Sequence, residues 1–313
     1  MSRILVSGSL AYDHIMDFPG LFKDHFMADK LHNINVSFNI ETHRENFGGT
    51  AGNVAYSLDL LGEDTSIIAT AGNDFARYRT YLEGLGINTD SIHIDDAQAT
   101  ASAYIMTDQA DNQIAAFHPG ASAIPYGSDL PLASDSVAII SAGCLADIRA
   151  FPDIFRGNGV KFLFDPGQSI LAMTGNDLRN GITNAHTVFA NDYEFAMISE
   201  KTGWKEADVL RSAEALIITL GEKGSLVFSS KGSSQIKAVR AVGAKDPTGA
   251  GDAYRAGYIK ALSMGMPIED CAQLGSTVAA YAVEAYGTQS HRFTLQELQE
   301  RYLAAYEKTI VLF

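Results

Sequence analysis

The chain carries the stretch Asp246-Pro247-Thr248-Gly249-Ala250-Gly251-Asp252, and an apolar helical pattern of small residues begins directly after it. The two glycines allow a tight turn, and the following helix would point its unpaired N–H groups at one place. A helix N-terminus attracts anions such as phosphate. A carboxylate there would repel phosphate, unless Asp252 takes a proton from an attacking hydroxyl. The stretch therefore indicates phosphoryl transfer to an alcohol.

A purely structural explanation of this stretch stays open at this point. Aspartate is a favoured helix N-cap, and glycine turns before helices are common. Two other nucleotide-binding loops are disfavoured. No Gly-Lys-Ser/Thr follows the glycines, so the stretch is not a P-loop. It is also not the dinucleotide fingerprint, which follows the first strand of a βαβ unit.

The composition indicates a large, acidic protein. The 313 residues are 46% hydrophobic, and the formal net charge is −14. No basic cluster is present, so we expect no nucleic-acid partner, and ATP would have to be bound by local N–H groups and a metal ion. No apolar run is long enough for a membrane span, and the apolar run that starts at Ile4 is too short for a signal peptide. We therefore expect a cytoplasmic protein with no membrane partner.

The two cysteines, Cys144 and Cys271, lie far apart in the sequence. No Cys/His spacing typical of zinc surrounds them. Free cysteine is among the most buried residue types, so we expect two buried free thiols.

Short apolar runs alternate with helical patterns along most of the chain, which is typical of a doubly wound α/β core with a mostly parallel sheet and helices on both faces. The expected strands are 4–6, 65–70, 137–141, 161–164, 187–189 and 216–220. The clearest helical patterns are 50–61, 74–85, 250–264, 267–285 and 294–308. A further helix is expected to open at 191–194.

Two pieces of the chain have a different character. Residues 12–47 are polar and poor in helix signals, with a weak strand pattern at 31–38. Residues 101–106 and 113–117 read as a hairpin. We expect 12–47 and 99–118 to form a small β-sheet lid over a core made of 1–11, 48–98 and 119–313. Such a lid would exclude water from phosphoryl transfer.

Three motifs resemble those of the PfkB/ribokinase family of carbohydrate and nucleoside kinases. They are the stretch 246–252, the glycine motif Gly48-Gly49-Thr50-Ala51-Gly52-Asn53, and Asn191-Asp192-Tyr193-Glu194. Further stretches at 8–14, 71–79, 113–120 and 201–204 are similar to bacterial adenosine kinases of this family. The resemblance covers essentially the whole chain and implies a ribokinase-like fold.

The resemblance also implies roles for the residues around the acceptor. Asp252 would be the base that takes the proton of the 5′-hydroxyl, and the N–H groups of Gly249, Ala250 and Gly251 would stabilise the transferring phosphoryl group. The residues implied in nucleoside binding are Asp13, Gly49 and Asn53 for the ribose, Ser9 and Gln168 for the base, and Phe117 as an aromatic side chain from the lid that stacks on it.

On the donor side, the resemblance implies a site for ATP and Mg²⁺. Thr219, Gly221 and Ser276 would line the ATP groove. Asn191 and Glu194 would position Mg²⁺ through water, because Mg²⁺ tends to keep its waters. The loop at Asp246 and Thr248 is similar to a monovalent-cation site in related kinases, which suggests K⁺.

Two positions depart from the adenosine kinase pattern. Ala103 stands where these enzymes have a second aromatic residue, and Ser169 stands where they have a second glutamine. Losing a stacking ring could cost about 1 kcal/mol. Tyr104 is next to Ala103, but neighbouring side chains of a strand face opposite ways. Inosine, guanosine, cytidine or a bare sugar therefore stay open as acceptors.

Adenosine kinase is the leading functional hypothesis. A broader nucleoside kinase or a sugar kinase of the same fold is the main alternative, and a non-catalytic ligand-sensing protein is a remote one, because it would not need Asp252. Arg255 could clamp a phosphate or lie at the surface. The edges of a β lid often pair between subunits, so we expect a homodimer.

Overall fold

A computed structural model describes residues 4–26, 35–110, 112–133 and 136–312. Its core is a nine-stranded sheet with the order β13-β12-β11-β10-β9-β8-β1-β4-β5. Strand β12, next to one edge, pairs antiparallel with both β11 and β13, and all other neighbouring strands pair in parallel. The strands are β1 (Ile4–Ser7), β4 (Thr65–Gly72), β5 (Ile92–Asp95), β8 (Val137–Ser141), β9 (Lys161–Asp165), β10 (Thr187–Asn191), β11 (Ala215–Thr219), β12 (Ser225–Ser229) and β13 (Gly232–Ile236).

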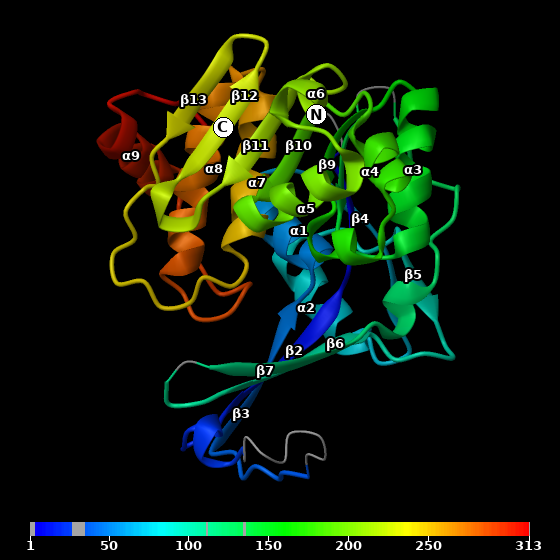
Figure 1. The fold of residues 1–313 in the computed structure, drawn as a ribbon, viewed down its shortest axis with the longest axis vertical. Coiled ribbons are helices and arrows are strands. Elements are labelled where there is room, and N and C mark those ends of the chain that lie inside the picture. Colours follow the sequence, from blue (N-terminus) through cyan, green and yellow to red (C-terminus); the bar gives the residue numbers. More distant parts are fainter. Residues whose placement is uncertain (1–3, 27–34, 111, 134–135, 313) are drawn as a thin grey trace.

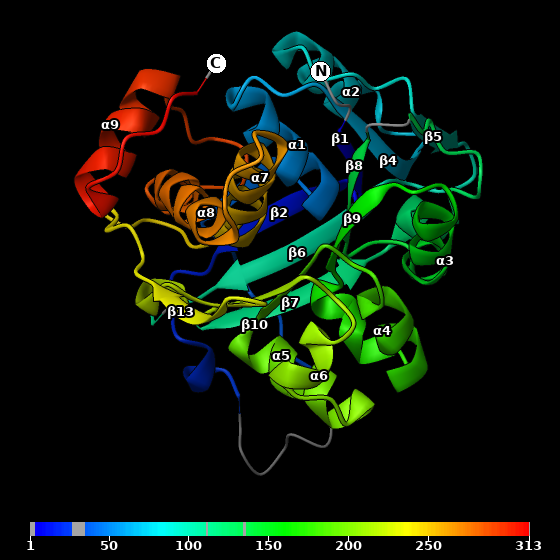
Figure 2. The ribbon, with the colours of Figure 1, turned by 90° about the horizontal axis from the view of Figure 1, so that it is seen from above.

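Helices cover both faces of this sheet (Figure 2). One layer holds α1 (Thr50–Leu60), α2 (Ala76–Leu85), α7 (Ala250–Ser263), α8 (Ile268–Val283) and α9 (Leu295–Tyr306). The other holds α3 (Leu145–Gly157), α4 (Gly175–Ile182), α5 (Asp192–Thr202) and α6 (Glu206–Leu210). Alternate residues of β1 belong to separate cores: Ile4 and Val6 pack on the first layer and Leu5 on the second. Burial of both faces explains why these strands are continuous apolar runs.

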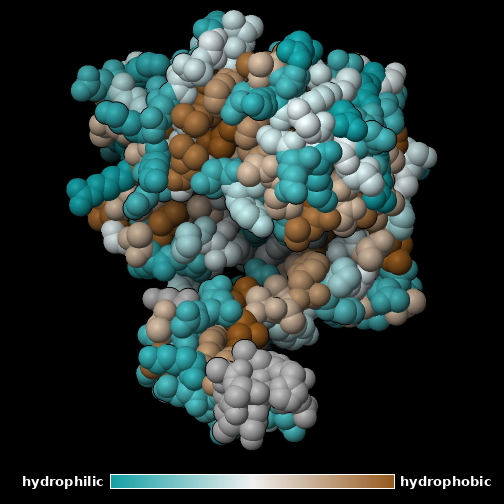
Figure 3. All heavy atoms as spheres, viewed as in Figure 1, coloured by the Kyte–Doolittle hydropathy of each residue, from teal (hydrophilic) through white to brown (hydrophobic). Residues whose placement is uncertain are grey.

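The smaller sheet lies beside the core as a separate layer (Figure 1). Its order is β3-β2-β6-β7, from β2 (Ala11–Asp17), β3 (Thr42–Gly48), β6 (Ala101–Thr107) and β7 (Gln113–His118). The expected hairpin is β6–β7, with Ala103 opposite Phe117. The two distant pieces are joined because β2 pairs with β6 in parallel. The surface is hollowed where this lid meets the core (Figure 3).

The strand expected at 31–38 is wrong in its described part, since residues 27–34 lie outside the described residues and 35–38 form no strand. The ring of Phe38 packs edge-on against Phe18 and Phe22, at centroid distances of 5.0 and 5.3 Å. The apolar residue that suggested a strand therefore belongs to an aromatic cluster beside the lid. The strand of this region begins later, at Thr42.

The topology places a site at the carboxyl ends of β1 and β8. These strands are neighbours, but the chain continues from β1 towards β4 on one side and from β8 towards β9 on the other. Open α/β sheets bind ligands at such a switch point. The backbones approach closely there: a Cβ on Gly143 would lie 2.8 Å from the carbonyl carbon of Gly8.

In the described part of the chain, no helix is long and apolar enough to cross a membrane.

Candidate active site

Asp252 lies in the first turn of α7, and it does not cap the helix. The N-cap is Gly249, in the left-handed conformation with φ 77°, and no side chain caps this end. One carboxylate oxygen of Asp252, Oδ2, instead accepts a hydrogen bond of 2.8 Å from Asn53 Nδ2 of α1. The structural explanation of Asp252 as an N-cap is therefore wrong.

The surroundings of Asp252 raise its pKa to about 7, mainly because the carboxylate is buried. The negative charges of Asp165 and Asp13 also raise the pKa, while the Asn53 hydrogen bond and the Arg255 charge lower it. A base works best when its pKa lies near the working pH. Asp252 is therefore suited to accept a proton from a hydroxyl group near neutral pH.

The turn before α7 provides fewer free donors than expected. The N–H of Ala250 donates to the Pro247 carbonyl at 3.1 Å. The N–H groups of Gly249, Gly251 and Asp252 have no acceptor among the described residues. These three are the donors that the turn and the helix end can offer to an anion.

A buried ion pair lines the same cavity as Asp252. Arg255 Nε and Nη2 donate to the two carboxylate oxygens of Asp165 at 2.9 and 2.8 Å. The guanidinium also lies 5.0 Å from the ring centre of Phe189. Both charged residues are more than 90% buried. Arg255 is therefore not a surface residue. Its partner Asp165, at the end of β9, was not among the predicted site residues, although its place at the end of a buried strand is a signal for a site.

The glycine motif shapes the start of α1. A Cβ on Gly49, where φ is 87°, would lie 2.5 Å from the Ser9 carbonyl oxygen, so only glycine fits. Ser9 Oγ accepts a hydrogen bond of 3.2 Å from the Thr50 N–H. Ser9 thus ties β1 to this helix. Its hydroxyl also lies 3.5 Å from Thr50 Oγ1, which can accept its hydrogen because the Thr50 hydroxyl donates to the Ala142 carbonyl.

Asp13 projects from β2 towards the core and lines a cavity of about 730 Å³ with Asn46, Asp246 and Thr288. Burial raises the pKa of Asp13 to about 6, and the charge of Asp246 raises it further. A Cβ on Gly48 would lie 2.1 Å from Asp13 Oδ2, so this glycine makes room for the carboxylate. Asp13 and Asp252 lie close enough for the Asp13 charge to raise the Asp252 pKa.

A cavity of about 260 Å³ lies under the lid hairpin. Its lining includes Ser9, Phe117, Cys144, Gln168 and Ser169. The side chain of Phe117 is 57% exposed. Cys144 is only partly buried, so its expected burial is wrong, whereas Cys271 is buried as expected. Cys144 faces a cavity because it precedes α3 at the switch point.

Tyr104 does not replace the missing ring at Ala103. Its ring stacks on His14 with a centroid distance of 4.7 Å, on the face of the lid opposite to Asp13 and Ile105. The expectation from strand geometry is thus confirmed. Phe117 remains the aromatic residue of this cavity.

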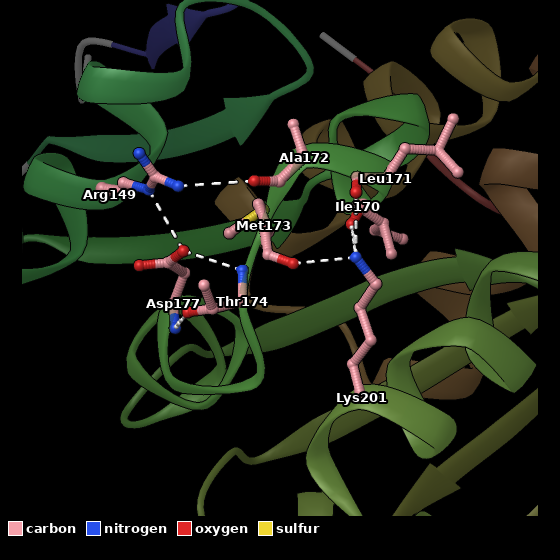
Figure 4. Close-up of polar contacts among 8 residues, drawn as sticks. All are labelled: Arg149, Ile170, Leu171, Ala172, Met173, Thr174, Asp177 and Lys201. Atoms are coloured by element: carbon pink, nitrogen blue, oxygen red, sulfur yellow. Dashed lines mark hydrogen bonds and ion pairs between the residues drawn. The ribbon is translucent and has the colours of Figure 1, made fainter.

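Gln168 and Ser169 lie on the short 3-10 helix η4 (Gly167–Ala172), which is held in place by side chains of α3 and α5 (Figure 4). Lys201 Nζ of α5 donates to the carbonyls of Ile170, Leu171 and Met173 at 2.8, 2.9 and 2.8 Å. Arg149 of α3 donates to the Ala172 carbonyl and pairs with Asp177 at 3.1 Å (Figure 4). Two helices therefore hold the segment that carries the polar side chains of the cavity.

A second cavity, of about 440 Å³, adjoins the first through Ala142 and Gln168. Its lining includes Asp252, Asn191, Glu194, Thr219 and Gly221. Asn191 and Glu194 form a reciprocal capping box at the start of α5, with two hydrogen bonds of 2.8 Å.

No group of three or more His, Cys, Asp or Glu side chains in the described residues could hold a metal ion alone. Glu194 is partly buried, and burial raises the pKa of its carboxyl. Its Oε1 atom is not part of the capping box. These residues therefore fit Mg²⁺ only if water and phosphate supply the other ligands.

A cavity of about 670 Å³ continues from there between β11, α7 and α8. Thr219, Gly221 and Gly251 line both cavities, and Ser276 lines the outer one. Ser276 Oγ accepts a hydrogen bond of 3.0 Å from the Val239 N–H. The three cavities thus adjoin one another through shared lining residues, and Asp252 lines the middle one.

Asp246 joins two loops at the other side of Asp252. One carboxylate oxygen accepts from the Thr248 N–H at 2.9 Å, and the other accepts from the Gly287 N–H at 3.1 Å. The carboxylate is thus already occupied by backbone donors, so a cation would have to share these oxygens.

A buried carboxylate in the first turn of a helix, a cavity that it lines between two others and a β lid are together typical of lidded α/β kinases that phosphorylate a hydroxyl group. The family described as pfkB carbohydrate kinases matches residues 2–294. The chain belongs to this family.

Its relatives include kinases of nucleosides and of sugars. It is 31% identical to a nucleoside kinase of Methanocaldococcus jannaschii, over 96% of this chain and 97% of that one. It is 26% identical to a ribokinase of Haemophilus influenzae, over 95% of this chain and 97% of that one. The solved structure of Burkholderia thailandensis nucleoside kinase in complex with inosine is similar, with a TM-score of 0.87 and 35% identity over 98% and 99% of the two chains. The fold is therefore ribokinase-like.

Proposed function

We propose that this protein is an ATP-dependent nucleoside kinase with adenosine as its main acceptor, and that Asp252 takes the proton of the ribose 5′-hydroxyl. The observation that carries the proposal is the position of Asp252. Its carboxylate has a pKa of about 7 and lines a cavity that adjoins both the lid cavity and the outer cavity. A nucleoside in the lid cavity and ATP in the outer one would meet at this residue.

The acceptor would be held by residues of the lid and of α1. Asp13, Gly49 and Asn53 would bind the ribose. Phe117 would stack on the base, and Ser9 and Gln168 would contact its edge. Phe117, Ser9 and Gln168 line one cavity, which supports a common ligand for them.

The donor would lie along the other cavities, with Thr219, Gly221 and Ser276 around ATP. The turn at Gly249, Ala250 and Gly251 would stabilise the transferring phosphoryl group, with Gly249 and Gly251 as its free donors, because Ala250 is already hydrogen-bonded. Mg²⁺ would neutralise phosphate charge, positioned by Asn191 and Glu194 through water.

A K⁺ ion near Asp246 and Thr248 would have to share the Asp246 carboxylate with the N–H groups of Thr248 and Gly287.

A broader acceptor range is the second candidate. Ala103 leaves the Phe117 cavity without a second ring, and Ser169 replaces an amide by a hydroxyl. A similar kinase has been solved with inosine. These observations favour inosine, guanosine or cytidine as further acceptors, and a ribokinase among the relatives keeps sugars in the range to be tested.

A panel of acceptors tests the proposal. Adenosine, inosine, guanosine, cytidine and ribose are each incubated with the protein, ATP and Mg²⁺, and ADP formation is followed together with the phosphorylated product. We expect the highest kcat/KM with adenosine. Comparable values for several nucleosides would support the broader kinase, and preference for ribose would remove the nucleoside assignment.

We also propose how the chain is divided between the lid and the core around this site. Residues 12–47 and 99–118 form the lid, and residues 1–11, 48–98 and 119–313 form the core. The acidic charge and the scarcity of cysteine favour a cytoplasmic enzyme. A homodimer through the lid is proposed from the exposed side chains of Tyr104 and Ile114.

A further inference from the structure

A chain of buried hydrogen bonds runs from a backbone carbonyl to Asp252. The Tyr78 hydroxyl of α2 donates to the Gly48 carbonyl at 2.9 Å. Gln289 Nε2 donates both to this hydroxyl, at 2.6 Å, and to Asn53 Oδ1, at 3.0 Å. Asn53 Nδ2 then donates to Asp252. Tyr78, Gln289 and Asn53 are at most 7% exposed.

The direction of this chain is fixed at its start. A backbone carbonyl can only accept, so the Tyr78 hydrogen points to Gly48 and its oxygen is left to accept from Gln289. The second N–H of Gln289 then meets the oxygen of Asn53, which turns the N–H₂ group of Asn53 towards Asp252. The oxygen of Gln289 has no partner among the described residues, so the donor side of this amide makes its contacts.

The reverse arrangement would work against a base. With the Gln289 amide turned round, its oxygen would accept from Tyr78, and the Gly48 carbonyl would lose its donor. The Asn53 carbonyl would then face the Asp252 carboxylate, which is tolerable only if the carboxyl is protonated.

We infer that Gln289, anchored by Tyr78, is a positioning residue that fixes the orientation of the Asn53 amide and so keeps Asp252 in the ionised form that can accept a proton. The inference rests on the proposed role of Asp252 as the base. Gln289 lines none of the four cavities described, so a direct contact with substrate does not explain its buried amide, whereas this positioning role does.

The third glycine of the motif at 48–53 supports the same circuit. A Cβ on Gly52 would lie 2.0 Å from the Tyr78 hydroxyl oxygen and 2.9 Å from Gln289 Nε2. Gly52 thus leaves the space in which the two side chains meet, although its own φ does not require glycine.

Other charges also act on the base, and they set the background for a test. Asp165 of β9 and Asp13 of β2 raise the pKa of Asp252, and Arg255 of α7 lowers it. Substitutions of Gln289 and Tyr78 leave these three groups in place. A change in the pKa of Asp252 would therefore report on the hydrogen-bond circuit.

The test measures the Asp252 pKa directly, without substrate. The protein is labelled with ¹³C at the aspartate carboxyl carbons and titrated by NMR, and the Asp252 signal is assigned by its loss in Asp252→Asn. In Gln289→Met, of similar size, we expect the pKa to rise by about one unit, because the Asn53 amide is no longer held in orientation and its hydrogen bond to the charged carboxylate is weakened. In Tyr78→Phe we expect a smaller rise, of about half a unit.

Tyr56→Phe is the matched control. The buried Tyr56 hydroxyl of α1 donates to the His291 carbonyl at 2.6 Å, so this change also removes one bond between α1 and the loop that carries Gln289. It lies outside the circuit and should leave the Asp252 pKa unchanged.

An unshifted pKa in folded Gln289→Met, or in Tyr78→Phe if the first variant does not fold, would overturn the inference. An equal shift in Tyr56→Phe would do the same, because it would assign the effect to loosened packing.

A kinetic measurement separates this inference from the proposed function. In both circuit variants, the acidic limb of the kcat/KM profile should move to higher pH with the pKa, and kcat/KM at pH 6 should fall about tenfold in Gln289→Met. If the protein phosphorylates no nucleoside, the kinase proposal fails while the NMR titration still decides the circuit.

Discussion

Asp252 combines three properties that a single residue rarely has. It belongs to the first turn of a helix, its carboxylate is held by one amide donor, and burial keeps its pKa near neutrality. A carboxylate in that state can exchange a proton with a hydroxyl group at little cost. Substitutions of Asp252 therefore test the proposed chemistry most directly.

Replacing Asp252 by Asn should remove the base while leaving the donor site intact. We expect kcat to fall by roughly 10²–10⁴-fold. ATP binding should change little, because Asp252 does not line the cavity around Ser276. The measurements are steady-state kinetics and ATP titration by calorimetry. Asp59→Asn, which changes another partly buried carboxylate outside the described cavities, is the control, and near-normal turnover of Asp252→Asn would rule out its role as base.

The raised pKa of Asp252 also predicts how stability depends on pH. The folded protein holds this proton with a pKa of about 7, against about 4 in the unfolded chain, so the folded state binds the proton more tightly. Its contribution is present below pH 4 and is lost as the pH rises through 7. Asp252→Asn should therefore raise the Tm by a few degrees at pH 8, and by less at pH 5. Thermal melts at the two pH values check this, and a larger gain at pH 5 would contradict it.

Ala103 offers the sharpest test of the lid cavity. It lies opposite Phe117 in the β6–β7 pairing, so Ala103→Phe would place a second ring beside the proposed base site. We expect the KM for adenosine to fall about three- to tenfold, from an aromatic contact of about 0.5–1.5 kcal/mol. Tyr104→Leu changes the other face of the same strand and should leave the KM unaltered. An unchanged KM in Ala103→Phe would argue that no base stacks on Phe117.

At the scale of elements, α5 joins the two halves of the site. Its first turn carries the Asn191–Glu194 capping box, and Lys201 near its end holds two carbonyls of η4 and that of Met173 just after it. An ammonium group with three donors satisfies these acceptors at once. The position of Gln168 therefore depends on a helix whose other end borders the phosphate cavity.

Lys201→Met should leave these carbonyls without their donor and loosen η4 (Figure 4). We expect the KM for the nucleoside to rise several-fold with a smaller change in kcat, and the Tm to fall by a few degrees. Lys205→Met, on the exposed start of α6, is the matched control. A loss of kcat with an unchanged KM would place the effect at the other end of α5.

The elements that could be predicted from the sequence are those with strong physical signals. The strands β4, β8 and β9 are continuous apolar runs because both faces are buried. The strand β13 was missed, since it has one buried residue, Ile236, in a run of small polar ones. Helix α3 was missed as well, although it is amphipathic, because its pattern is interrupted by Pro152.

The candidate site could be predicted only in part. Asp252, Gly49 and Asn53 could be singled out as candidates because glycine turns before helices leave a recognisable pattern. The contacts between distant residues could not be predicted. Gln289 lies 236 positions from Asn53 in the sequence, and Arg255 lies 90 positions from Asp165. Such contacts are set by how the layers pack, and no local periodicity records them.

At the scale of the whole molecule, the lid leaves an edge strand and apolar side chains exposed in a single copy. All residues of the edge strand β7 are exposed, and Tyr104 and Ile114 expose 44% and 39% of their surface. Edge strands with exposed apolar side chains are commonly covered by another chain. A second copy of the same lid would supply a matching strand and a matching apolar face.

We therefore expect a homodimer that forms through the lid, measurable by sedimentation velocity at micromolar concentration. Ile114→Lys should shift the protein to monomers, because it places a charge within the apolar face of the lid. Ile94→Lys changes an equally exposed isoleucine, 42% exposed, on the core strand β5 and should leave the dimer intact. A wild-type protein that stays monomeric would contradict the dimer, and a dimer broken by Ile94→Lys alone would place the association elsewhere.

If the dimer also covers the hairpin with Phe117, Ile114→Lys should raise the KM for the nucleoside. The affinity for ATP should stay the same, since Ser276 and its cavity lie in the core.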